Sequence, residues 1–207
     1  MYNGFAFMVF FGHSMKIMRR ILVISTACLA AALSLASCGI NRKSIRLPAE
    51  PVVTVEQEDV SMTLRFLDEP SLRQRFGTSE NPFLTDYSRA LLRRNVVFEL
   101  TIRNKGSASF PFELQDCELQ YGGKALPPLN RFQQASDVNL RDEDRRLKAP
   151  KTALINKYVL PNRATLASGS MLTGFLLFQG NLPVSGEALV TIPGFEGQAS
   201  FQFRYAF

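Results

Sequence analysis

The chain has 207 residues, of which 20% are charged and 46% hydrophobic, and its formal net charge is +6. Three of its 24 basic residues (Lys16, Arg19 and Arg20) precede residue 38, and no acidic residue does, so the remaining chain carries about +3. So small an excess gives no reason to expect binding to nucleic acid, which needs a strongly basic face. The only histidine of the sequence, His13, also precedes residue 38. We therefore expect no imidazole-based catalytic site and no zinc site in the rest of the chain. A phosphate-cradling Gly-rich loop and the EF-hand spacing are also missing, so we predict no cofactor and no other metal site.

An apolar stretch at residues 21–35 follows the three basic residues and runs into small ones. A basic region, an apolar core of about 7–15 residues and small residues before a cleavage point are typical of a secretory signal peptide. A transmembrane helix, the alternative, needs about 20 apolar residues. We predict a signal peptide at residues 1–37. Residues 1–14 contain no Lys or Arg. We predict that translation starts at Met15 or Met18 and that the residues upstream of this start do not belong to the protein.

The four residues Leu35-Ala36-Ser37-Cys38 resemble the lipobox of bacterial lipoproteins. The resemblance implies cleavage before Cys38 and attachment of acyl chains such as palmitate to that cysteine. Two or more chains hold a protein firmly at a bilayer, so the membrane is the first partner that we expect. The next residue is Gly39 rather than Asp. For a protein that resembles Gram-negative lipoproteins, in which Asp at this position tends to retain the protein in the inner membrane, this implies the outer membrane.

The three cysteines have different predicted fates. Cys28 leaves with the signal peptide and Cys38 carries lipid, so Cys117 remains alone and no disulfide within the chain is expected. We predict that Cys117 is a small buried apolar residue rather than a reactive thiol.

Residues 38–51 read as a tether, and strand patterns begin at Val52. Apolar and polar residues alternate at 52–66, 96–102, 110–121, 188–192 and 201–207. A period of two indicates half-buried strands. Gly122-Gly123 predicts a hairpin turn, and Asn104-Lys105-Gly106-Ser107 a longer one. The apolar parity changes near Gln115-Asp116, which predicts a bulge or bend there.

Two segments have helical features instead. Asn81-Pro82 is typical of a helix start, and Phe83, Tyr87 and Leu91 then share one face of a short helix. In the insertion at residues 125–166, we predict a helix over 136–148 that ends before Pro150.

The same insertion contains a predicted strand at residues 153–160 and the predicted partner surface. Function is often carried by loops on a rigid scaffold, whereas a mixed charge run is also typical of a solvated face. The surface consists of Asp142, Glu143, Asp144, Arg145 and Arg146.

Residues 96–121, followed by Gly122-Gly123-Lys124, resemble the immunoglobulin-like domains of secreted bacterial proteins that are often called telokin-like. Residues 167–178 resemble a later element of these domains. The resemblance covers about half of the chain after Cys38. It implies a mainly β fold, an immunoglobulin-like β-sandwich at residues 52–207 with short helical insertions, and it carries over no functional residue.

Together these observations predict a lipid-anchored protein of the cell envelope, a non-catalytic binding or accessory module with an envelope protein as its partner. One alternative is a hydrolase of envelope glycans that uses neighbouring carboxylates, either Asp68 and Glu69 or the three at residues 142–144. Another is a small outer-membrane β-barrel, since aromatic residues alternate up to the terminal Phe207.

Overall fold

The computed structural model describes residues 47–84, 94–141, 144–180, 186–194 and 199–207. The chain divides into two units, residues 1–42 and 43–207. The first unit lies outside the described residues, and with it the predicted signal peptide and Cys38.

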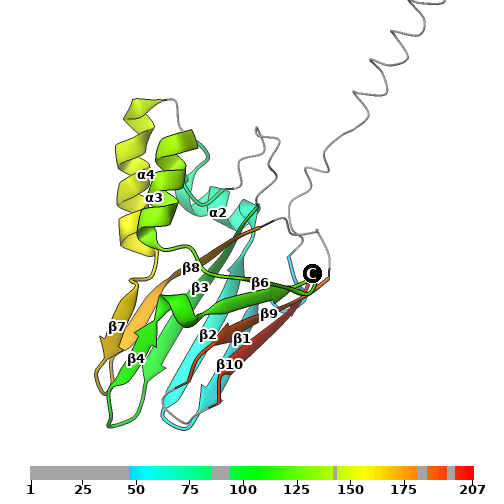
Figure 1. Ribbon diagram of the computed structural model, residues 1–207, viewed down its shortest axis with the longest axis vertical. Helices are drawn as coiled ribbons and strands as arrows, with labels where there is room; N and C mark the ends of the chain where they lie inside the picture. The colour runs from blue at the N-terminus through cyan, green and yellow to red at the C-terminus, as the bar shows by residue number, and fades with distance from the viewer. Residues whose placement is uncertain (1–46, 85–93, 142–143, 181–185, 195–198) are drawn as a thin grey trace, which may run out of the picture. The chain divides into compact units, whose positions relative to one another are not determined.

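The described chain is mainly β, with three antiparallel sheets (Figure 1). The first sheet has the order β1 (Val52–Gln57), β2 (Val60–Leu67), β3 (Arg94–Asn104), β8 (Met171–Gly180). The second has the order β10 (Phe201–Ala206), β9 (Glu187–Ile192), β5 (Glu118–Tyr121), β6 (Lys124–Leu126). The third pairs β4 (Phe110–Glu113) with β7 (Arg163–Leu166). The helices are α2 (Glu69–Phe76), α3 (Arg131–Arg141) and α4 (Arg145–Tyr158).

The first two sheets pack face to face around the main apolar core, which confirms the predicted β-sandwich. Strand β3 contributes Val96, Phe98, Leu100 and Ile102, all at alternate positions and all at most 1% exposed. The second sheet contributes its own alternate residues, among them Phe201, Phe203 and Tyr205 of β10. The Tyr205 hydroxyl donates a hydrogen bond of 2.7 Å to the carbonyl of Leu64 and so joins the two sheets.

Helices cover one end of the opposite face of the first sheet. Val97, Phe175 and Leu177 point to that side and form a second core with Val138 of α3 and Ile155 of α4. Strand β8 is therefore apolar on both faces, as expected for a strand between two layers. The result is a layer of helices, the first sheet and the second sheet.

The predicted turns are confirmed. Gly122 and Gly123 have φ angles of +55° and +74°, and they connect β5 to β6 in a two-residue hairpin. The predicted interruption at Gln115-Asp116 is also present, but it is not a bulge within one strand. A 3₁₀ turn (Leu114–Asp116) moves the chain from the third sheet to the second, so the strands before and after it belong to different sheets.

The insertion differs from the sequence prediction. Instead of one helix at 136–148, a stop at Pro150 and a strand at 153–160, it forms α3 and α4, and Pro150 lies inside α4. Asp144 caps α4, since its carboxylate accepts a hydrogen bond from the backbone N–H of Arg146 at 3.0 Å. Leu147, Leu154 and Ile155 then recur at helical spacing, and burial of this stripe outweighs the missing N–H of Pro150.

Helix α2 was not predicted, although it has a clear start signal. Asp68 accepts a hydrogen bond from the Ser71 N–H at 3.0 Å, and Pro70 lies in the first turn. Of the helix predicted after Asn81, residues 85–93 lie outside the described part. Asn81 itself accepts from the Phe83 N–H at 3.0 Å and donates to the Leu72 carbonyl at 2.9 Å, which ties this turn to α2.

Candidate functional site

The predicted lipidation site and part of the predicted partner surface lie outside the described residues. These are Cys38, Asp142 and Glu143. The remaining members of the partner surface, Asp144, Arg145 and Arg146, begin α4. Their role as a partner surface stays a prediction.

Asp144 has a structural task at this position. Its carboxylate accepts bonds from the Arg146 guanidinium at 3.1 and 3.2 Å in addition to the backbone bond of the cap. The Arg146 side chain holds the pKa of Asp144 below its ordinary value. Arg145 and Arg146 are both exposed. They present cationic groups to solvent, while the carboxylate of Asp144 is already paired with Arg146.

The carboxylates of the alternative hydrolase prediction that are described also serve a helix. Asp68 caps α2, and Glu69 forms an ion pair of 3.7 Å with Arg73 one turn later. Both groups therefore have local partners that account for their positions at the start of α2.

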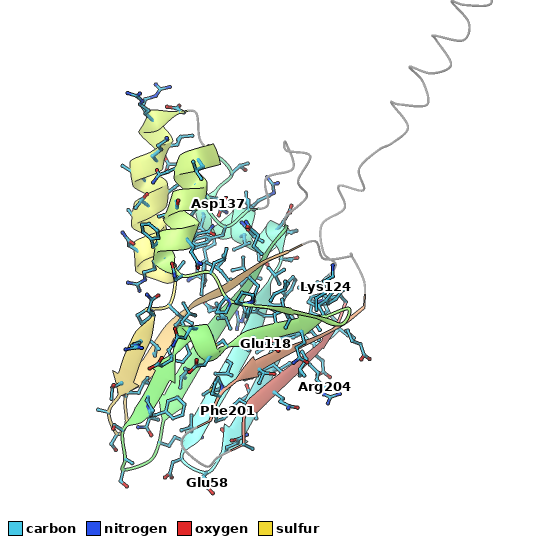
Figure 2. All side chains as sticks on the ribbon, viewed as in Figure 1. Glu58, Glu118, Lys124, Asp137, Phe201 and Arg204 are labelled. Carbon is cyan, nitrogen blue, oxygen red and sulfur yellow. The ribbon has the colours of Figure 1, made fainter. Side chains whose placement is uncertain are left out.

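An open groove of about 780 Å³ lies at the end of the second sheet where β5 turns into β6. Its wall is completed by residues 49 and 50 of the tether. Four exposed charged residues line it: Lys124, Arg204, Glu50 and Glu187. Figure 2 shows Lys124 at the hairpin and Arg204 on β10. Sequence reasoning did not find this groove, because its residues come from four separate segments.

The strand register sets the floor of the groove. Gln120 of β5 faces Leu189 of β9, which in turn faces Arg204 of β10, so the three form a row across the outer side of the sheet. Side chains in such a row lie about 5 Å apart. Leu189 is half-buried between its two polar neighbours, and the row therefore offers an apolar contact flanked by an amide and a guanidinium.

Two tyrosines line the inner end of the groove. The Tyr205 hydroxyl is occupied by its bond to the Leu64 carbonyl, and burial raises the pKa of Tyr205. Gly186, with φ of +133°, lies against Tyr121: a Cβ there would come within 2.9 Å of the Tyr121 hydroxyl. Both side chains belong to the main apolar core, and Tyr205 does not titrate near neutral pH.

Cys117 is buried, as predicted from the sequence. It is 2% exposed and free, and burial raises its pKa to about 12. Its thiol donates a weak hydrogen bond of 3.9 Å to the carbonyl of Glu113. A neutral buried thiol of this kind is unreactive.

A row of four threonines crosses the uncovered part of the first sheet, formed by Thr54, Thr63, Thr101 and Thr173. Thr54 and Thr63 share a hydrogen bond of 3.0 Å between their hydroxyls, and Thr101 and Thr173 one of 3.2 Å. Such cross-strand pairs stabilise a sheet, which accounts for the row.

No family model matches the chain, and no curated protein matches it. Several solved structures align with it, among them the following three. A lipoprotein candidate (ycdA) of Bacillus subtilis subsp. subtilis str. 168 is 10% identical with a TM-score of 0.41, over 75% of this chain. The yjhA protein of Bacillus subtilis is 12% identical with a TM-score of 0.42, over 72% of this chain and 93% of that one. A functionally unknown protein from Listeria monocytogenes EGD-e is 8% identical with a TM-score of 0.43, over 80% and 86%.

The chain spans 38% of the length of the first of these proteins. Similarity at this level assigns neither a family nor a function to the chain. Among the described residues, no helix has the length and apolar character needed to cross a bilayer. In the same residues, no group of three or more His, Cys, Asp or Glu side chains is placed to hold a metal ion.

Proposed function

We propose that the protein is a lipoprotein of the cell envelope, anchored in the membrane through Cys38, and that it acts as a non-catalytic binding or accessory module. The observation that carries the proposal is Leu35-Ala36-Ser37-Cys38 at the end of a basic and then apolar leader. Several acyl chains on Cys38 make the anchor firm. Gly39 favours the outer membrane where the envelope has two membranes.

We further propose that the sandwich is immunoglobulin-like. Two four-stranded antiparallel sheets packed face to face fit that architecture. The helices α3 and α4 lie between β6 and β7 in the chain, and they are additions to such a sandwich rather than part of its core of strands.

The groove beside the β5–β6 hairpin is the surface that we assign to an envelope protein partner. It is open, it lies where the tether enters the domain, and it carries two cationic and two anionic side chains. Groups of both signs around an apolar floor suit a peptide segment that itself carries both charges. Because Tyr205 is occupied and buried, we assign the groove a binding role and no catalytic one.

The anchor is tested by growing cells with an alkyne analogue of palmitate. We expect the wild-type protein and a Cys117→Ala variant to be labelled and to sediment with membranes. The Cys38→Ala variant should lose the label completely, because the acylated thiol is gone. An unlabelled wild-type protein, with Cys38→Ala equally bound to membranes, contradicts the proposal.

The groove is tested by placing a photocrosslinking amino acid at Gln120 in the full chain in intact cells, with the exposed Thr54 as the control position. We expect a protein adduct from Gln120 and none from Thr54. Reversing two groove charges, with Lys124→Glu and Arg204→Glu, should lower the adduct yield about tenfold or more. Equal adducts from both positions, or a yield unaffected by the charge reversals, argue against the groove as the partner site.

A further inference from the structure

The two most exposed large apolar side chains of the described residues lie on one helix. Phe132 is 81% exposed and Leu140 is 76% exposed, and both belong to α3. The residues of α3 that are buried are Gln134 and Val138. At 3.6 residues per turn, Phe132 and Leu140 fall on the side of α3 opposite to that pair. Apolar side chains on an outward face bury nothing within the domain, so a second surface that covered Phe132 and Leu140 would remove apolar area from water.

The same helical hairpin is basic. Residues 131–158 contain seven Arg or Lys and four Asp or Glu. On α4 the basic residues Arg145, Arg146 and Lys157 are exposed. We call Phe132, Leu140, Arg145, Arg146 and Lys157 the hairpin surface.

Bonds between the two helices hold this surface in place. Lys148 donates to the carbonyl of Asn139 at 2.9 Å, and Arg131 donates to the carbonyl of Val159 at 2.8 Å. These contacts lie at opposite ends of the hairpin. Leu140 therefore lies at the same end of the hairpin as Arg145 and Arg146. Phe132 lies at the other end, with Lys157. A helix of 14 residues is about 21 Å long, so the surface has an apolar and a basic group at each end of that length.

We propose that the hairpin surface docks on an anionic bilayer, with the basic side chains on lipid phosphates and with Phe132 and Leu140 in the interface. The proposal rests on the proposed anchoring at Cys38. Leu47 lies nine positions after Cys38 in the chain, with eight residues between them. Even when fully extended this segment reaches only about 30 Å, so an anchored domain stays next to the bilayer.

The tether enters the domain at the end of the first sheet that carries the helices. Val52 at the start of β1 pairs with Arg65 near the end of β2, and α2 follows two residues after β2 ends. Figure 1 shows α2, α3 and α4 together at this end. The opposite end has the exposed Glu58 and Asp59 in the turn between β1 and β2, and an anionic surface disfavours that end.

The chemistry of the hairpin surface is that of interfacial binding. Basic residues at an anionic leaflet each strengthen association about fivefold, and exposed aromatic and aliphatic side chains add apolar burial. Arg146 already pairs with Asp144, but its side chain is 90% exposed. Exposed pairs contribute little, so Arg146 can exchange that carboxylate for a phosphate.

The test uses the full-length lipidated protein in vesicles, with an environment-sensitive dye on Phe132→Cys or Leu140→Cys. Cys117 does not compete for the dye, because it is buried and its pKa is about 12. Met171→Cys is the control, because Met171 is 60% exposed and lies at the start of β8, at the end away from the helices. In vesicles of phosphatidylethanolamine and phosphatidylglycerol, we expect the emission at positions 132 and 140 to shift to the blue and that at 171 to stay unchanged.

Two comparisons attribute the shift to anionic lipid. Vesicles of phosphatidylcholine alone should give no shift. The triple variant Arg145→Glu, Arg146→Glu and Lys157→Glu should weaken the association of the hairpin surface with the bilayer about a hundredfold. The measure is the phosphatidylglycerol content of the vesicles at which the blue shift returns. All three residues are exposed, and an unchanged circular dichroism spectrum verifies that the variant is folded.

Unshifted dyes on protein that is bound to the vesicles overturn the docking and leave the proposed anchor standing. A shift that occurs in native membranes and not in protein-free vesicles identifies a protein as the occupant, which also overturns it. Protein that carries no lipid on Cys38 and stays out of the vesicles overturns both the docking and the proposed function.

Discussion

Replacing Phe175 with alanine is expected to lower the free energy of unfolding by about 3–5 kcal/mol. Phe175 is 1% exposed and lies at the centre of the contact between the helices and the first sheet. Its ring meets that of Phe83 edge-on at 5.0 Å and stacks on Tyr158 at 5.5 Å. The Arg75 guanidinium lies 5.1 Å from the ring centre. Removing the ring leaves a cavity that rigid neighbours on three elements cannot fill.

Phe132→Ala is the matched control, because the same atoms are removed from a side chain that is 81% exposed. Its effect on the free energy of unfolding should stay within about 0.5 kcal/mol. Urea unfolding of the full-length variants, followed by circular dichroism, measures both. Equal losses for the two variants would show that the helical layer does not pack on β8 as described.

Asn104→Ala is expected to cost about 3 kcal/mol, because Asn104 is the hydrogen-bonding centre of the loops at the end away from the helices. Its side chain is 1% exposed. The amide donates to the carbonyls of Ala108 at 2.7 Å and Leu166 at 3.0 Å, and its oxygen accepts from the Gly106 N–H at 3.1 Å. Alanine leaves these buried groups without a partner. The same urea unfolding measures the loss.

Asn104→Asp separates hydrogen bonding from volume. A carboxylate there faces the carbonyl oxygens of Ala108 and Leu166, so the folded protein should raise its pKa above the usual value of about 3.9. A pKa raised by folding destabilises the folded state increasingly as pH rises. Compared with wild type, the variant should therefore be least impaired below about pH 4 and should lose stability up to the raised pKa. A difference from wild type that does not vary with pH rules out this arrangement of carbonyls.

Local patterns predicted most strands and turns, because each depends on residues close in the chain. The alternation in β3 and β10 names the inward-facing residues correctly. The Gly122-Gly123 hairpin follows from two residues that tolerate positive φ. The mainly β sandwich follows from these patterns together.

The helical layer was harder to predict, since burial against other elements decides it. Leu154, Ile155 and Val159 favour a strand when taken alone, yet the Asp144 cap and the packing of Ile155 on the first sheet select α4. One signal was available. The run Phe175-Leu176-Leu177-Phe178 is apolar on both faces, which is typical of a strand covered on both sides.

The groove depends on register between distant segments, which the sequence pattern does not show. Gln120, Leu189 and Arg204 meet only because β5 and β10 both pair with β9. By contrast, the charged run at residues 142–146 drew attention in the sequence, and the structure gives part of it a capping role. The density of charged residues in a sequence does not distinguish a binding surface from residues that cap a helix.

The central claim is that Cys38 is the lipidated first residue of the mature protein. Intact-mass and peptide mass spectrometry of the protein purified from membranes tests it most directly. The account predicts a mature chain that begins at Cys38, with the mass of a diacylglyceryl group on its thiol and an acyl chain on its amino group. A membrane-bound protein whose Cys38 lies inside the chain, or is unmodified, would contradict it.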